Sequence, residues 1–243
     1  MNMKKVLYFI LIFSSVVSCK QDVTQQAQPV TTGNLTIQVG YRFDASSLLT
    51  DTILYTNAAG FKMSVTRLQY FISDINLTNA NGGSYLINQA FFMDAKDLSF
   101  ASINLTNVPF GNYTGMTFNI GLDSVMNVPY GLPLTPENNN MVWPTTMGGG
   151  YHFMKMEGYY IDTATVYGYT MHLGKNASRV PITLSNKSFS ISSTPANVKL
   201  KMNVSEWFKN PLVFDFDKDG NYTMGNDALM IKLKNNGVDV FND

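Results

Sequence analysis

Hydrophobic and polar residues alternate along most of the chain, a pattern typical of half-buried β-strands. The clearest runs are Leu35, Ile37, Val39, Tyr41 and Phe43, and then Val198, Leu200, Met202 and Val204. Other strands are predicted at 67–77, 85–93, 113–121, 151–157, 167–173, 181–184 and 188–191. The turn sequence at 79–83 joins two of these strands, so they are expected to form a hairpin.

Helical signals are few and short. Ser205 is predicted to cap a single turn through Lys209, and Asn226 is predicted to cap a helix over 227–236 that stops at Gly237. We therefore expect an all-β fold, an antiparallel, Greek-key-like β-sandwich with one or two short C-terminal helices. The stretch 125–150 has no clear period, and a loop of this length within a compact domain is usually functional or disordered.

Composition narrows the functional classes. The 243 residues include 17 Lys and Arg against 17 Asp and Glu, so the chain lacks the basic excess that phosphate contacts require and nucleic acid is not an expected partner. Aromatic residues make up 13% of the chain, which argues against disorder. With one cysteine and two histidines, an intrachain disulfide and a cysteine-based zinc site are excluded.

The N-terminus has the features of a bacterial lipoprotein signal. Lys4 and Lys5 precede an apolar run over 6–17, which is too short to span a bilayer. Val-Val-Ser then leads into Cys19, the pattern of a lipobox. We predict a signal peptide at 1–18, a lipidated flexible tether at 19–33 and a single domain at 34–243. Lipid at Cys19 would anchor the protein to the bacterial outer membrane, facing the periplasm or the cell surface.

The two histidines define a candidate metal site. On a regular strand His152, Met154 and Met156 share one face, and His172 lies on a strand predicted to pair with theirs. Imidazole together with thioether suits copper. The alternative is that both methionines fill the core and both histidines are hydrogen-bonded structural groups.

A separate motif, rich in aspartate, suggests a calcium site. Asp215, Asp217 and Asp219 alternate before Gly220-Asn221, as in the first half of a calcium-binding loop, and Asn221 would complete the set. The twelfth position is Asn226 rather than a bidentate glutamate, and the same pattern occurs in plain β-turns. Calcium here would be structural.

Catalytic motifs are missing from the sequence. It contains no Gly-x-Ser-x-Gly elbow, and two histidines leave little room for a histidine-based triad. The glycines at 148–150 precede a strand rather than follow one, so they do not form a phosphate-binding loop. The chain is therefore not expected to be an enzyme.

An ordered set of segments resembles the MbnP-like copper-binding proteins, named for the methanobactin-associated periplasmic protein. The segments cover most of 34–241 and comprise LQYFISDINL at 68–77, VPFGNY at 108–113, FNIGLD at 118–123, MVW at 141–143, GYHFMKMEG at 150–158, HLG at 172–174 and NNGVDVF at 235–241.

The resemblance implies a periplasmic or surface β-sandwich that binds copper, with a diheme peroxidase as partner. In characterised members a tryptophan oxidised to kynurenine contributes to the copper site beside histidines. By position Trp143 matches that tryptophan and His172 matches the family's His-Leu-Gly histidine. Related proteins space the modified tryptophan two residues from a histidine, whereas Pro144 and Thr145 follow Trp143 here.

Two functions remain open from the sequence. The first is a lipid-anchored copper carrier or buffer that uses His152 and His172, with Trp143 nearby and Met154 or Met156 as an additional soft ligand. The second is a lipid-anchored adhesion module that binds a glycan or a protein without metal, for which the aromatic residues Tyr159, Tyr160, Tyr167 and Tyr169 would supply a stacking surface. The separation of the two imidazole rings distinguishes the two functions.

Overall fold

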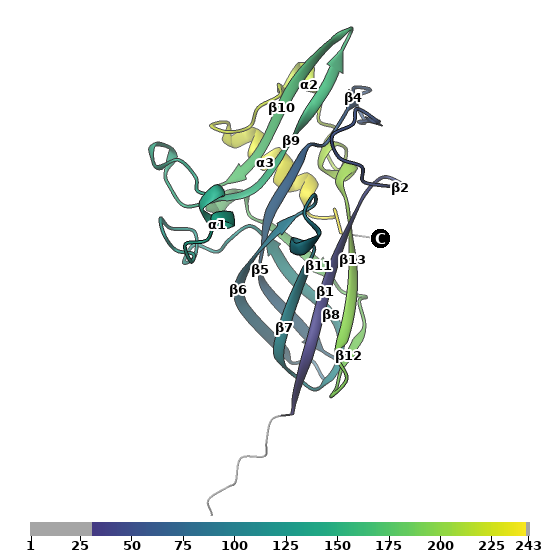
Figure 1. Cartoon of the computed structure of the whole chain (residues 1–243), viewed down its shortest axis with the longest axis vertical. Coiled ribbons are helices and arrows are strands. Elements are labelled where there is room, and N and C mark those ends of the chain that lie inside the picture. Colours follow the sequence, from purple (N-terminus) through teal and green to yellow (C-terminus); the bar gives the residue numbers. More distant parts are fainter. Residues whose placement is uncertain (1–30, 242–243) are drawn as a thin grey trace, which may run out of the picture. The chain divides into compact units, whose positions relative to one another are not determined.

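The computed structural model describes residues 31–241, which contain two β-sheets (Figure 1). The smaller sheet consists of β13 (Ala196–Asn203), β1 (Thr32–Phe43), β2 (Ser46–Ser47) and β7 (Ser102–Pro109). The larger sheet consists of β3 (Tyr55–Thr56), β4 (Lys62–Met63), β5 (Arg67–Asn79), β6 (Ser84–Asp94), β8 (Gly111–Ile120), β9 (His152–Asp162), β10 (Thr165–Gly174), β11 (Val180–Leu184) and β12 (Phe189–Ile191). The predicted all-β, sandwich-like class is confirmed.

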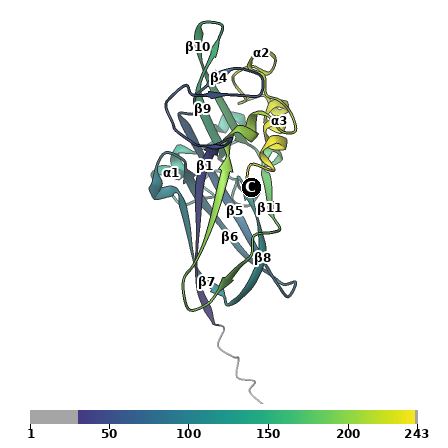
Figure 2. The same ribbon diagram turned by 90° about the vertical axis from the view of Figure 1, so that its right-hand side faces the viewer.

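The predicted signal peptide and the lipidation site Cys19 lie outside the described residues. The strand β1 begins at Thr32, two residues before the expected start of the domain. It pairs antiparallel with β7 but parallel with β13, where Leu35 lies opposite Ala196 and Arg42 opposite Asn203. The sheets are therefore not purely antiparallel, and β13 (green) lies beside β1 (purple) in Figure 2.

The strand β5 pairs with three other strands of the larger sheet, β6, β8 and β9. One edge of β5 pairs with β6, which confirms the predicted hairpin. The other edge pairs first with β9, from Arg67 to Tyr70, and then with β8, from Ile72 onwards. Two strands thus share one edge of β5 in succession, and β9 pairs with β10 along its whole length, from His152 to Asp162. This arrangement places the β9–β10 hairpin, which carries both histidines, at one end of the sheet.

The regular helices are short and comprise α1 (Pro136–Asn140), α2 (Phe216–Asp219) and α3 (Asp227–Gly237). The short 3-10 turns are η1 (Leu98–Phe100), η2 (Thr145–Met147), η3 (Asn176–Ser178) and η4 (Val204–Phe208). The cap of α3 is as predicted, since the side chain of Asn226 accepts a hydrogen bond from the amide of Leu229. The predicted cap at Ser205 is wrong, because its hydroxyl donates instead to Asp44 and the turn begins at Val204.

The core combines side chains from both sheets with those of the C-terminal segment. Trp207 of η4 is fully buried and packs on α3 at Gly237, where a Cβ atom would lie 2.5 Å from Trp207 Cζ3. Glycine is therefore required at this contact, because a larger residue would push α3 off the tryptophan. None of the helices in the described part of the chain has the length and apolar character needed to cross a membrane.

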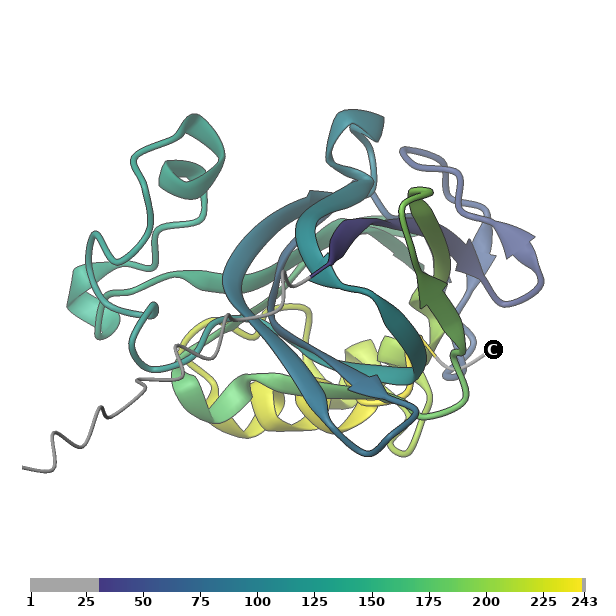
Figure 3. The same cartoon turned by 90° about the horizontal axis from the view of Figure 1, so that it is seen from below.

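The stretch over 125–150 has a defined structure although it lacks a periodic pattern. It projects to one side of the strands when the domain is viewed from below (Figure 3) and folds back onto the start of β9. The amide of Trp143 donates to Gly150 and the amide of His152 donates to Met141. Asn127 accepts from the amide of Tyr151. These bonds fix residues 141–143 beside the first residues of β9.

Candidate metal centre

A β-bulge decides which face of the β9–β10 hairpin His152 occupies. Lys155 lies opposite His172 and Met154 opposite Leu173, but the next pair joins His152 to Gly174, so Phe153 is an extra residue in β9. Side chains alternate along a regular strand, and one inserted residue reverses that alternation. His152 therefore emerges on the same face as His172.

The bulge overturns the expectation that His152 shares a face with the two methionines. Met154 and Met156 lie opposite Leu173 and Met171, which point away from the His172 side of the hairpin. Both methionines are fully buried in the hydrophobic core. Their thioethers therefore pack among apolar side chains, and the structure does not bring them to the histidines.

The two histidines and Trp143 form a contiguous aromatic cluster. The ring centroids of His152 and His172 are 5.0 Å apart, with the rings nearly perpendicular at 86°. The ring of Trp143 lies 4.7 Å from that of His152. His152 is 5% exposed and Trp143 is fully buried. Residues that are 9 and 20 positions apart along the chain thus meet at one point of the fold.

The orientation of His172 is set by a carboxylate. Its Nε2 lies 2.9 Å from Glu157 Oε1, and the guanidinium of Arg67 contacts both oxygens of the same carboxylate at 3.0 Å. Because a carboxylate only accepts, Nε2 carries a proton and the neutral ring has its lone pair on Nδ1. That Nδ1 atom is buried and has no hydrogen-bond partner.

The ring of His152 is held in a similar way by a backbone carbonyl. Its Nδ1 lies 3.2 Å from the oxygen of Met141, so Nδ1 is the protonated nitrogen and Nε2 has the lone pair. Burial, together with the positive charge of Lys155 and the neighbouring His172, lowers the pKa of His152 to about 3. His152 is consequently a neutral imidazole at physiological pH, which is the form that binds metals.

Two further contacts fix the backbone around the cluster. Thr223 Oγ1 accepts from the amide of His172 and donates to its carbonyl, which ties β10 to the segment after α2. Trp143 donates from Nε1 to the carbonyl of Met147, and its ring lies over Gly174. A Cβ atom on Gly174 would lie 2.4 Å from Trp143 Cε3, so only glycine allows the tryptophan this position.

Two imidazole rings at this separation can bind one metal ion through their unprotonated nitrogens. Nitrogen–metal bonds in proteins are about 2 Å long, so rings whose centroids are 5.0 Å apart can both reach the same ion. Among residues 31–241, no group of three or more His, Cys, Asp or Glu side chains is placed to hold an ion. Structural zinc sites generally take four protein ligands, and the two histidines supply two.

Comparison with known proteins assigns the chain to a family. The family model described as MbnP matches residues 32–225. The chain belongs to the MbnP family. The solved structure of MbnP from Methylosinus trichosporium is similar at a TM-score of 0.53 and 14% identity, covering 76% of this chain and 81% of that one, a likeness in fold. Among curated proteins none matches the chain by sequence.

In this MbnP family member the predicted calcium residues serve other roles. Asp215 caps α2 and pairs with Lys218 at 2.6 Å, while Asp219 pairs with Lys232 at 2.6 Å. Asn221 donates to the carbonyl of Gly168. Asp217 lies within the turn of α2. The structure therefore does not gather these oxygens into a ligand set in the described part of the chain.

The aromatic platform proposed for adhesion is divided by the sheet. Tyr160 and Tyr169 are buried, at 7% and 1% exposure, and Tyr169 donates from its hydroxyl to the carbonyl of Ser64. Tyr159 and Tyr167 are exposed but occupy opposite faces, because Tyr167 lies opposite Tyr160 in the pairing of β9 with β10. Four stacked rings are thus not available at one surface.

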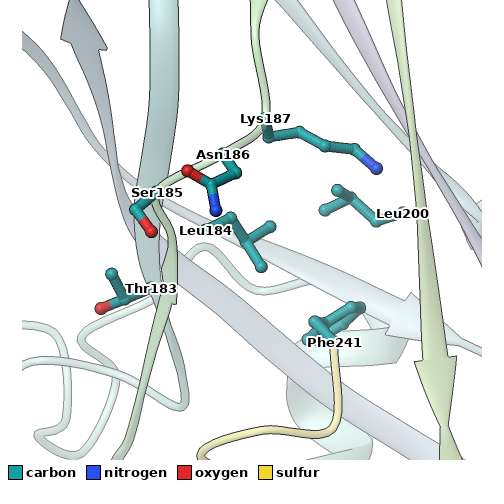
Figure 4. Close-up of a pocket in the computed structure, with 7 residues that line it drawn as sticks. All are labelled: Thr183, Leu184, Ser185, Asn186, Lys187, Leu200 and Phe241. Carbon is teal, nitrogen blue, oxygen red and sulfur yellow. The ribbon is translucent and has the colours of Figure 1, made fainter. Parts of the chain in front are cut away.

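A cavity of about 350 Å³ lies elsewhere, where β11 and β13 separate (Figure 4). It is lined by Leu184, Leu200 and Phe241, with Thr183, Ser185, Asn186 and Lys187 nearby. This lining contains neither histidine and no carboxylate. The cavity therefore adds nothing to the metal centre.

Sequence reasoning missed three groups of the centre, which are Glu157, Arg67 and the carbonyl of Met141. Glu157 belongs to the segment GYHFMKMEG at 150–158. Lys155 and Glu157 are two residues apart on a predicted strand, so the sequence could have placed both charged side chains on the face of the strand opposite to Met154 and Met156. Arg67 reaches the site because it lies opposite Glu157 in the pairing of β5 with β9. The role of the Met141 carbonyl depends on the fold of 125–150 and has no sequence signature.

Proposed function

We propose that this protein binds one copper ion, as Cu(I), between Nδ1 of His172 and Nε2 of His152. The observation that carries the proposal is the buried Nδ1 of His172, which has no hydrogen-bond partner. A buried polar atom without a partner costs about 1–3 kcal/mol, and a metal ion bound there would remove that cost. The protonated nitrogens of both rings are engaged by Glu157 and Met141, as is usual for metal-binding histidines.

We infer a carrier or buffer rather than an enzyme. Both rings are largely buried, and Glu157, the carboxylate that contacts His172, is already engaged by Arg67, so within residues 31–241 this carboxylate is not free to act as a base. The resemblance to MbnP-like copper-binding proteins supports copper as the metal. The lipobox at Cys19 supports an outer-membrane lipoprotein facing the periplasm or the cell surface, and the same resemblance supports a diheme peroxidase as partner.

Metal analysis tests the proposal directly. The protein titrated with Cu(I) under reducing, anaerobic conditions is expected to bind one ion per chain, because the two imidazole rings, with centroids 5.0 Å apart, form a single pair. X-ray absorption of the loaded protein should show nitrogen ligands without a sulfur shell, since Met154 and Met156 lie on the opposite face of the hairpin. A protein that takes up no Cu(I), or a sulfur-dominated spectrum, would contradict the assignment.

The family resemblance also implies oxidation of Trp143 to kynurenine. The structure is compatible with this proposal, because the ring of Trp143 lies 4.7 Å from that of His152 although the two residues are not close in sequence. Protein purified from its native cells should carry a mass change of about +4 Da that peptide mapping assigns to Trp143. The second tryptophan, Trp207, is an internal control, because it packs on α3 at Gly237 rather than beside His152 and should keep its ordinary mass.

A further inference from the structure

The metal centre has a buried cation that the proposed ligand set does not use. Lys155 is 8% exposed and lies directly opposite His172 in the pairing of β9 with β10. Its ammonium group donates to the carbonyl oxygen of Asn140. A buried lysine is rare unless it is paired with an acid, so its presence beside two candidate ligands calls for an explanation.

The positive charge of Lys155 is not neutralised by an adjacent acid. In the described part of the chain no carboxylate oxygen lies within 4 Å of its ammonium nitrogen. The nearest acid in the site, Glu157, is shared by Arg67 and His172, so its negative charge is offset by the guanidinium. Lys155 and Arg67 against Glu157 thus leave a formal excess of about one positive charge beside the two rings.

The contacts of Lys155 hold this charge next to both histidines. Asn140, whose carbonyl accepts from Lys155, directly precedes Met141, whose carbonyl accepts from His152. The same backbone segment therefore positions the ammonium group and one imidazole, and the strand pairing places the other imidazole opposite the lysine.

We propose that Lys155 makes the two-histidine centre selective for monovalent ions, favouring Cu(I) over Cu(II) and over divalent ions such as zinc. This inference rests on the proposed copper function. The repulsion energy between two charges grows with their product. The ammonium group therefore reduces the binding free energy of a divalent ion by twice as much as that of a monovalent ion. A neutral carbonyl partner preserves this discrimination, whereas a carboxylate partner would cancel it.

The selectivity is measured by comparing the binding of four ions to wild type and two variants. Dissociation constants for Cu(I), Ag(I), Cu(II) and Zn(II) are determined for wild type, Lys155→Gln and Lys155→Arg. Glutamine can still donate to the carbonyl of Asn140 but has no charge, and arginine keeps the charge. The ratio of divalent to monovalent affinity is expected to rise about tenfold or more in Lys155→Gln. This estimate assumes charges separated by several ångströms at an effective dielectric near 20. In Lys155→Arg the ratio is expected to stay near the wild-type value.

A metal-free measurement complements the titrations. The pKa of His152, followed by NMR, is expected to rise in Lys155→Gln, because the repulsion that opposes protonation is removed. A divalent-to-monovalent affinity ratio in Lys155→Gln that matches wild type would overturn the proposal, whether or not the pKa of His152 changes. If wild type binds neither Cu(I) nor Ag(I), the proposed function itself fails and the selectivity fails with it. Cu(I) binding with an unchanged ratio in Lys155→Gln overturns only the role of Lys155.

Discussion

Replacing His172 with asparagine is expected to weaken Cu(I) binding more than about a hundredfold. Removing a residue that only hydrogen-bonds to a metal ligand typically costs about 10–100-fold in metal affinity, and removing the ligand itself should cost more. His152→Asn should have a similar effect. The rings supply the two lone pairs at the centre, and their centroids are only 5.0 Å apart. Competition titrations with a Cu(I) chelator of known affinity measure the loss, and circular dichroism checks that each variant is folded.

Two control variants separate a ligand from a neighbouring residue. Glu157→Gln should lower the affinity for Cu(I) only about 10–100-fold, because it weakens the hydrogen bond that orients His172 but leaves the ligand in place. Met156→Leu should leave the affinity unchanged, since Met156 lies on the opposite face and leucine has a similar volume. A loss in Met156→Leu as large as in His172→Asn would show that the ligand set is wrong.

Acid is expected to destabilise the metal-free protein strongly through His152. Folding lowers the pKa of His152 from 6.5 to about 3, so between these values the unfolded chain binds more protons than the folded protein. The free energy of unfolding must then fall as the pH falls through this window. The contribution of His152 amounts to a loss on the order of 4 kcal/mol between pH 7 and pH 3.

Urea unfolding of metal-free wild type and His152→Asn between pH 7 and pH 3 tests this expectation. Carboxylates also lose stabilising interactions in acid. One of them is Glu157, whose pKa is lowered mainly by its hydrogen bond with His172. Most of these carboxylates titrate alike in both proteins. The difference between the two slopes therefore isolates His152. We expect a clearly shallower pH dependence in His152→Asn, and parallel curves would show that folding does not lower the pKa of His152.

Much of the secondary structure could be predicted from local patterns. The alternation in 35–43 and 198–204 corresponds to β1 and β13, because a sheet with one buried face imposes a period of two on its strands. The cap of α3 at Asn226 is equally local, since it depends on one side chain and an amide three residues later. The parallel pairing of β1 with β13 was not predictable in this way, because it joins segments about 160 residues apart.

The contents of the metal centre could be predicted only in part. The two histidines and Trp143 stand out because the chain has so few residues of these types. The assignment of Met154 and Met156 as additional ligands followed from regular alternation, and the bulge at Phe153 invalidates that step. A bulge depends on how two strands settle against their neighbours, so one extra residue moves a side chain to the other face without a signal in the sequence.

The sequence by itself determined the class of fold, the positions of most strands, the resemblance to the MbnP family and the two histidines, because these depend on composition, short-range periodicity and local motifs. The tertiary structure decided that His152 faces His172, that Glu157 and Met141 leave one nitrogen of each ring available, and that a buried Lys155 lies beside them. These relations depend on strand register and on the path of the 125–150 segment. Both arise from packing between residues distant in the chain.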